Sequence, residues 1–371
     1  MSLRIAQVAT MGFPVPPRGY GSVEKVVHAL TETLVGEGHE VLLIAAQGST
    51  SSARLHEVPG TPWAFNRVGE STHSLVDRMR VVRHIRNVLL RHVDELDIVH
   101  FHSAWMAEAL QPSLPIPSVT TLHMQLDSPD NRNTLGKWDA GPLVSVSDAQ
   151  RQGVRDLDLP WVATVYNGLP LHETTWLGSG EGGYLAFLGM LSPTKDPAGA
   201  MRAAIAADMP MRVAGPAPWY EGEYMREVLN PLLAHPLIDW IGEIGDSERG
   251  AFLGDAVGTV CTTPGPEPGS LAIIESLAYG TPVIGRHVGV PPEKVHDGIH
   301  GYLATTDGER EAACRALGRI SRSTCRTWAL QRFSQQRMTQ DYVRVYETVL
   351  GGHLVSQMAD DHRAAQPKWT R

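Results

Sequence analysis

The 371-residue chain has few cysteines, no long apolar run and no excess of positive charge, and each shortage excludes a class of protein. Its three cysteines lie far apart without Cys-x-x-Cys spacing, which predicts reduced thiols in a cytoplasmic protein rather than a disulfide framework. Its apolar stretches are much shorter than the roughly 18 residues that a transmembrane helix needs. With 32 basic and 40 acidic residues, the net charge of −8 argues against a nucleic-acid partner.

Strands and helices alternate along the whole chain. In the first half, apolar runs predict strands at 3–10, 39–46, 97–102, 118–123, 143–146 and 162–165, with helices at 22–37 and 75–92. In the second half, we expect strands at 184–189, 211–214, 238–241, 258–262 and 283–284, and helices at 197–207, 223–234, 247–253 and 271–279. Near-continuous apolar strands between helices are typical of parallel sheets covered on both faces. The fold class is therefore α/β, with two doubly wound, Rossmann-like halves.

A Gly/Ser-rich segment, TTWLGSGEGG at 174–183, interrupts the alternation and marks a domain boundary. We expect an N-terminal domain over 1–174 and a C-terminal domain over 184–336. From about 326 the pattern is helical to about 350, and the polar tail from 351 is expected to be loosely held. Two such domains would face each other across a cleft.

The loop PPRGYGS at 16–22 joins the first strand to its helix, and it includes Arg18, Tyr20, Gly21 and Ser22. Small residues at this place allow backbone N–H groups and a helix N-terminus to approach an anion. The plain alternative is a turn with Ser22 as the helix cap. The segment lacks the Gly-x-Gly-x-x-Gly pattern of dinucleotide-binding enzymes, which weakens a dehydrogenase interpretation.

Lysine is scarce, so a lysine beside a glycine-rich turn is informative. Only five of the 32 basic residues are lysines: Lys25, Lys137, Lys195, Lys294 and Lys368. The segment FLGMLSPTKD leaves a predicted strand through Gly189 and enters a helix just after Lys195. From that position Lys195 could reach a diphosphate at the helix start, the alternative being a solvated surface lysine.

Two glutamates, Glu267 and Glu275, are separated by seven residues in the segment EPGSLAIIE. Glu267 lies in a loop after a strand, and Glu275 about one turn into the next helix. Carboxylates placed in this way can each accept hydrogen bonds from the vicinal hydroxyls of a sugar, at about 1.5 to 3 kcal/mol per charge-assisted bond. The amides between them, at Gly269, Ser270 and Leu271, could meet phosphate.

The chain resembles the retaining glycosyltransferases of family 4, which have the GT-B fold. The similarity runs along most of the sequence, through GYGSVE, GHEV, DIVHFHS, VTTLH, VSVSDAQR, TVYNGL, FLGMLSPTKD, YGTPVIG, GVPPEKVHDGIHGYL and RFSQQRMTQDYVRVY, with the spaced glutamates as the most specific part. The opening PPRGYG is similar to that of antibiotic-pathway members such as the avilamycin-type enzymes.

The resemblance implies a role for each matched position. Gly21, with Ser22, would contact the donor phosphates through the backbone, and His123 would bind the donor sugar. Lys195 would hold the diphosphate. Glu267 would bind hydroxyls of the transferred sugar, and Glu275 the ribose of the nucleotide. The last helix, over 337–371, would return to the first domain, and the acceptor would bind near Arg18 and Tyr20.

Three positions depart from the family pattern. Met190 stands where the family usually has arginine, which removes a bidentate phosphate contact that lysine does not reproduce. Gly269-Ser270 replaces Phe-Gly, and Ser22 replaces the second glycine of the first loop, so two Cβ atoms narrow the space for phosphate. Arg18 or Arg286 is a hypothetical substitute for the missing guanidinium.

Two patterns in the sequence could indicate a metal site, and each has a simpler explanation. His100, His102 and His123 could form a metal trio, but strand histidines packed in a core are the better interpretation. Asp156-Leu-Asp158 matches the Asp-x-Asp of metal-dependent glycosyltransferases of another fold, yet so short a motif arises by chance.

The sequence therefore predicts a cytoplasmic, metal-independent hexosyltransferase without a cofactor. Its donor would be a nucleoside diphosphate sugar of the UDP or GDP type, and its acceptor the hydroxyl of a small molecule or saccharide. The anomeric configuration would be retained through a same-face reaction in which the leaving phosphate helps to deprotonate the acceptor. A non-catalytic nucleotide-sugar binding protein and a GT-B-fold nucleotide-sugar epimerase remain as alternatives.

Overall fold

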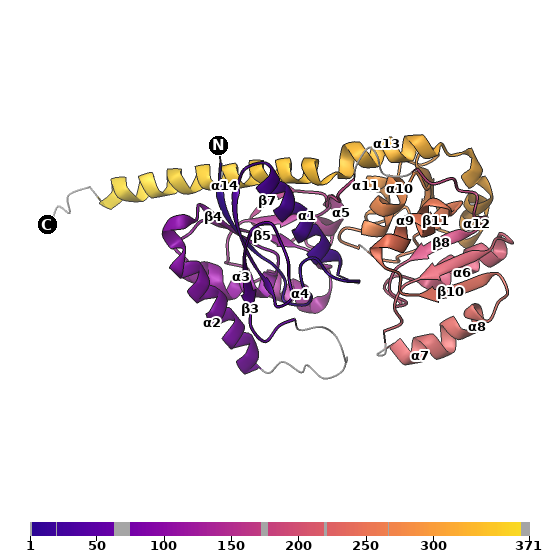
Figure 1. The fold of residues 1–371 in the computed structure, drawn as a ribbon, viewed down its shortest axis with the longest axis horizontal. Helices are drawn as coiled ribbons and strands as arrows, with labels where there is room; N and C mark the ends of the chain where they lie inside the picture. The colour runs from indigo at the N-terminus through magenta and orange to yellow at the C-terminus, as the bar shows by residue number, and fades with distance from the viewer. Residues whose placement is uncertain are drawn as a thin grey trace.

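The computed structural model describes residues 2–19, 21–62, 75–171, 177–218, 221–265 and 267–364. They form two lobes, each built on one parallel sheet (Figure 1). The first lobe has seven strands in the order β3-β2-β1-β4-β5-β6-β7, and the second has six in the order β10-β9-β8-β11-β12-β13. The neighbouring strands of both sheets run parallel, so the predicted fold class is confirmed.

In the first lobe, strands and helices follow one another in chain order. The elements are β1 (Arg4–Val8), α1 (Ser22–Gly36), β2 (Glu40–Ala46), β3 (Arg54–Val58), α2 (Leu75–Arg91), β4 (Ile98–Phe101), α3 (Ala104–Leu110), β5 (Ser118–Leu122), α4 (Pro129–Leu135), β6 (Leu143–Ser145), α5 (Asp148–Gln152) and β7 (Trp161–Thr164). Short 3₁₀ turns lie at Val93–Glu95 and Gln111–Ser113.

The second lobe repeats the alternation. Its elements are β8 (Leu185–Leu188), α6 (Pro197–Ala206), β9 (Met211–Ala214), α7 (Gly222–Tyr224), α8 (Asn230–Leu233), β10 (Ile238–Gly242), α9 (Asp246–Gly254), β11 (Gly258–Val260), α10 (Leu271–Ala278), β12 (Val283–Gly285), α11 (Pro291–Lys294), β13 (Gly301–Leu303), α12 (Asp307–Ala316), a 3₁₀ turn (Leu317–Arg319) and α13 (Arg322–Phe333). The helix predicted at 223–234 is interrupted by a π-helical segment, Met225–Leu229.

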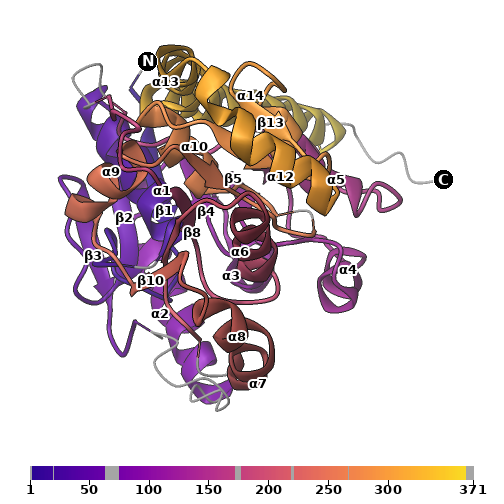
Figure 2. The ribbon, with the colours of Figure 1, turned by 90° about the vertical axis from the view of Figure 1, so that its right-hand side faces the viewer.

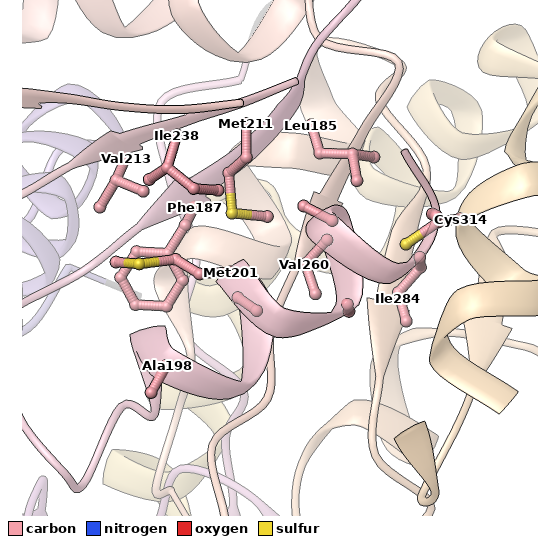
Figure 3. Packing of buried hydrophobic residues seen from close by; sticks show 14 of the residues in the cluster. Leu185, Phe187, Ala198, Met201, Met211, Val213, Ile238, Val260, Ile284 and Cys314 are labelled. Carbon is pink, nitrogen blue, oxygen red and sulfur yellow. The ribbon is translucent and has the colours of Figure 1, made fainter. Parts of the chain in front are cut away.

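Alternate residues of the central strands face opposite cores, as expected for a sheet covered on both sides. Leu185 and Phe187 of β8 pack with α6 in one cluster, whereas Ala186 packs with Phe252 of α9 in another. Figure 2 shows α6 and α9 on opposite sides of this sheet, and Figure 3 shows the cluster on the α6 side. Burial on both faces explains why these strands read as continuous apolar runs.

The last helix, α14 (Gln335–Ala364), leaves the second lobe and runs along the first (Figure 1). Its side chains Met338, Tyr342 and Tyr346 are fully buried against α1 and the first sheet. The return of the helix agrees with the expected architecture. The helix continues to Ala364, beyond the end predicted at about 350, whereas 365–371 lie outside the described residues.

The boundary predicted at 174–183 lies partly outside the described residues, and from 177 the chain runs into β8. No helix among the described residues is long and apolar enough to cross a membrane.

Candidate functional site

A cavity between the two lobes, here called the interlobe cavity, brings most of the predicted site residues together. The first lobe contributes Gly19, Gly21, Ser22 and Lys25, at the start of α1. The second lobe contributes, among others, Gly189, Met190, Lys195, Arg249, Glu267, Ser270, Leu271 and Glu275. These residues follow the carboxyl ends of parallel strands, where ligands bind in open α/β sheets.

Three of the described residues predicted for the site do not line this cavity. Gly269 lies behind the turn, where a Cβ would meet the amide of Asn167 at 2.5 Å. Arg18 is exposed, and His123 lies at the end of β5. Tyr20 lies outside the described residues.

The entry loop to α1 requires glycine at position 21. Gly21 has φ of +147°, and a Cβ there would lie 2.7 Å from Cβ of Pro17. Gly21 is also the N-cap of α1, so the alternative with Ser22 as the cap was wrong, and Ser22 is the first residue of the helix. The helix therefore begins at the cavity wall, with its first N–H groups lacking intrahelical partners.

Lys195 and Glu267 form an ion pair inside the cavity. Lys195 Nζ contacts Glu267 Oε1, and Thr263 Oγ1 donates to Glu267 Oε2 at 3.3 Å. Burial by itself would raise the pKa of Glu267, but the charge and hydrogen bond of Lys195 outweigh it and hold the pKa below its usual value. Glu267 is therefore an anion, able to exchange its lysine partner for sugar hydroxyls.

Glu275 forms a second ion pair, with Arg249 of α9. Arg249 Nη1 lies 2.9 Å from Oε1 and 3.1 Å from Oε2 of Glu275. Arg249 Nε lies 3.5 Å from Asp246, which pairs across the cavity with Lys25 of the first lobe. Burial raises the pKa of Glu275, and Arg249 and Lys25 oppose that rise. Asp246 thus joins charges from both lobes beside Glu275.

Replacement of Glu275 by glutamine should lower both stability and donor affinity. The change leaves Arg249 without its carboxylate in a site where the Glu275 and Arg249 side chains are 11% and 16% exposed. Loss of one partner from a buried pair costs about 3 to 5 kcal/mol. Urea unfolding measures the loss of stability, and steady-state kinetics measure the rise in KM for the donor. An R249M/E275Q double variant should recover part of the stability. A single variant as stable as wild type would contradict the expectation.

The basic side chains of the cavity are Lys25, Lys195 and Arg249. Neither Arg18 nor Arg286, the hypothetical substitutes at the Met190 departure, lines it. Arg249 and Lys25 were not among the predicted site residues. No motif connects Arg249 to Glu275, and only the packing of α9 against α10 brings them together.

His123 begins a chain of buried hydrogen bonds that reaches α14. His123 Nε2 lies 3.0 Å from His102 Nδ1, and His102 Nε2 lies 2.7 Å from Gln7 Oε1. Gln7 Nε2 donates to Tyr346 Oη at 2.9 Å, which lies 2.9 Å from His100 Nδ1. The chain continues from His100 Nε2 to Thr121 Oγ1 at 2.7 Å and on to Tyr342 Oη at 3.0 Å.

The donor directions in this chain fix the tautomer of His123. Because Gln7 donates through Nε2, its Oε1 accepts a hydrogen bond from the N–H of His102 Nε2. A neutral His102 then accepts at Nδ1 from His123 Nε2. Burial lowers the pKa of His123 to about 4, so the ring is neutral and its Nδ1 is left as an acceptor. That atom could accept a hydrogen bond from a hydroxyl.

The neutral histidines make stability depend on pH. Burial lowers the pKa of His100 and His102 well below 6.5, and that of His123 to about 4. The unfolded chain takes up these protons near pH 6.5 and the folded chain only at lower pH, so stability falls as pH falls. We expect a loss of about 1.3 kcal/mol per histidine between pH 7 and pH 5.5 in urea unfolding. An H100Q variant should show a smaller loss, and no change for wild type would contradict the argument.

Neither metal pattern gains support from the geometry. His102 and His123 are hydrogen-bonded to each other, and His100 and His102 to uncharged side chains. The described residues contain no group of three or more His, Cys, Asp or Glu that could hold a metal ion. Asp156 pairs with Arg132 at the surface, at 2.5 Å.

Comparisons with known proteins agree with this architecture. A model described as glycosyltransferase family 4 matches residues 23–173, and one described as glycosyl transferases group 1 matches 178–329. A phosphatidyl-myo-inositol mannosyltransferase of Mycolicibacterium smegmatis is 22% identical over 96% of this chain and 97% of its own.

Two solved structures show the same fold. AviGT4, a glycosyltransferase involved in avilamycin A biosynthesis, is 24% identical with a TM-score of 0.68, over 94% of this chain and 98% of its own. Anabaena Alr3699/HepE, solved in complex with UDP and glucose, is 15% identical with a TM-score of 0.70, over 93% of this chain and 99% of its own.

Proposed function

Because the chain belongs to glycosyltransferase family 4 and has the GT-B fold, we propose that it transfers a hexose from a nucleoside diphosphate sugar to an acceptor hydroxyl, with retention of configuration. One observation carries the proposal: Lys195, Glu267 and Glu275 line a single cavity between the lobes, beside the start of α10. A cation, two carboxylates and unpaired helix amides match a diphosphate flanked by a sugar and a ribose.

Each residue has a part in this reaction. Lys195, with the first amides of α1 and α10, stabilises the charge that the leaving diphosphate gains. Glu267 positions the transferred sugar and Glu275 holds the ribose. His123 accepts a hydrogen bond at Nδ1 from a hydroxyl of the sugar. We assign Arg18 and Tyr20 to binding of the acceptor. The leaving phosphate takes up the acceptor proton, so no enzyme nucleophile is required.

The positive charge of Lys25, Lys195 and Arg249 supports a reaction without a metal or cofactor. A UDP-type donor is favoured because the relative Alr3699/HepE is solved with UDP and glucose. We place the protein in the cytoplasm, where nucleotide sugars are made and where its unpaired cysteines remain reduced.

Nucleotide binding followed by turnover tests the proposal. Melting temperature is measured with UDP, GDP, ADP and dTDP, since a ligand held only by the folded state raises it. A UDP-sugar is then incubated with a panel of acceptors, and the anomeric configuration of the product is read by NMR. A chain that binds none of the nucleotides would overturn the proposal.

Met190 gives specific support to a second candidate, a protein that binds a nucleotide sugar without transferring it. Binding of UDP without turnover over the whole panel would favour it. A donor incubated alone that yields an epimer would instead show an epimerase.

A further inference from the structure

Lys294, a residue to which the reaction above gives no part, is buried directly behind the turn that lines the interlobe cavity. It ends α11, and its side chain is 0% exposed. Its Nζ donates to the carbonyl of Gly269 and, at 3.3 Å, to the carbonyl of Ser270. The same ammonium lies 5.4 Å from the ring centroid of Phe333. One of only five lysines is thus placed entirely inside the protein.

The turn that Lys294 holds has an unfavourable backbone conformation. Ser270 has φ of 34° and ψ of 75°, in the left-handed region, and its side chain makes no capping hydrogen bond to the amides of α10. A residue other than glycine in this region costs about 1 kcal/mol or more and persists only where its surroundings hold it. The two bonds from Lys294 supply such a restraint.

The restraint also orients the amides of the turn. The carbonyls of Gly269 and Ser270 belong to the same peptide units as the N–H groups of Ser270 and Leu271, and in a trans peptide the two groups point in opposite directions. Lys294 occupies the carbonyl side. Ser270 and Leu271 line the cavity, so their N–H groups are the donors that an anion in the cavity would meet.

Stability alone gives no reason for a lysine at this position. Moving an ammonium out of water costs several kcal/mol, and an apolar side chain of similar volume would pack on Phe333 without that cost. Burial lowers the pKa of Lys294 to about 7, with Glu267 and Glu293 opposing and Arg337 reinforcing the effect. Cys261 also faces it, and burial raises the pKa of that thiol to about 12.

We propose that Lys294 is a positioning residue for the donor diphosphate: it holds the turn at 267–271 in its anion-binding conformation and adds positive charge behind it. The inference rests on the proposed function and deepens it, because it identifies a source of charge behind the wall of the same cavity that Met190 lines in place of the family's arginine.

The test compares wild type with K294M, using UDP as the probe in calorimetry at pH 6.5. We expect a melting temperature equal to or above that of wild type and a UDP affinity at least about tenfold weaker, which corresponds to one charge-assisted restraint. K137M, which removes an exposed lysine of the first lobe, is the matched control and should bind UDP as wild type does. Affinity within twofold of wild type for K294M would overturn the inference.

A pH series separates the charge from the hydrogen bonds. As pH rises from 6.5 to 8.5 Lys294 loses its proton, so the ratio of the UDP affinity of wild type to that of K294M should fall towards one. Ionisation of UDP is common to both proteins and cancels in the ratio. A ratio that stays constant over this pH range would overturn the contribution of the Lys294 charge to UDP binding.

If K294M does not fold, K294Q, which keeps a hydrogen-bond donor without the charge, takes its place in the comparison with wild type at pH 6.5. UDP affinity within twofold of wild type for K294Q would overturn the inference. Wild type that binds no UDP at any pH would instead overturn the proposed function.

Discussion

Replacement of Lys195 by methionine should lower kcat/KM for the donor by about 10²- to 10³-fold. The ammonium is the cation paired with Glu267 inside the interlobe cavity, where it can stabilise the leaving diphosphate. Removal of one preorganised donor from such a site typically costs about 2.7 to 4 kcal/mol of transition-state stabilisation. Steady-state kinetics with a saturating acceptor measure the effect.

Loss of stability has to be separated from loss of catalysis in this variant. K195M leaves Glu267, 17% exposed, as an uncompensated buried carboxylate, so its melting temperature should also fall. The K195M/E267Q double variant removes both charges and should regain stability while remaining inactive. As a matched control, R226M removes an exposed cation outside the cavity and should keep full activity. Activity regained by the double variant would contradict the assigned role.

Replacement of Glu267 by glutamine should lower kcat by about 10²-fold while UDP binds as tightly as before, or more tightly. The carboxylate is expected to accept two sugar hydroxyls, and charge-assisted hydrogen bonds contribute about 1.5 to 3 kcal/mol each. UDP carries no sugar hydroxyls to lose, and E267Q frees Lys195 from its ion pair. Kinetics and UDP calorimetry together give the two values.

The opposite signs make this prediction specific. A merely structural glutamate would, on substitution, weaken UDP binding and catalysis together. E223Q, at an exposed glutamate in the second lobe, controls for the change in charge. An unchanged kcat for E267Q would contradict the role of Glu267 in holding the sugar.

The central strands, the longer amphipathic helices and the edge strands β7 and β10 were predicted from the sequence, whereas the edge strands β3 and β13 were not. The strand β2 reads as an apolar run because both of its faces are covered. The strands β3 and β13 lie at the edges of their sheets, and their residues are partly exposed, so their sequences carry no comparable run. The strand β13 is also only three residues long.

For the site, sequence motifs pointed to Lys195, Glu267 and Glu275 but not to Arg249, the ion-pair partner of Glu275. Each motif covers a single strand–loop–helix unit. It therefore predicts on which element a side chain lies, but not which residue of another unit that side chain contacts. The contacts of Arg249 with Glu275 and of Lys294 with Gly269 join segments about 25 residues apart, and they depend on how separate helices pack. Such contacts follow from tertiary structure, which periodicity alone does not give.

The crossover of α14 means that the first lobe is not a self-sufficient fragment. A polypeptide ending near residue 171 would lack Tyr342 and Tyr346, so Gln7 and Thr121 would lose buried hydrogen-bond partners and the first sheet would lose part of its cover. A chimaera that swaps donor specificity between relatives therefore needs two junctions, one before β8 and one near Ser334. The residues from 335 onward then come from the same relative as the first lobe.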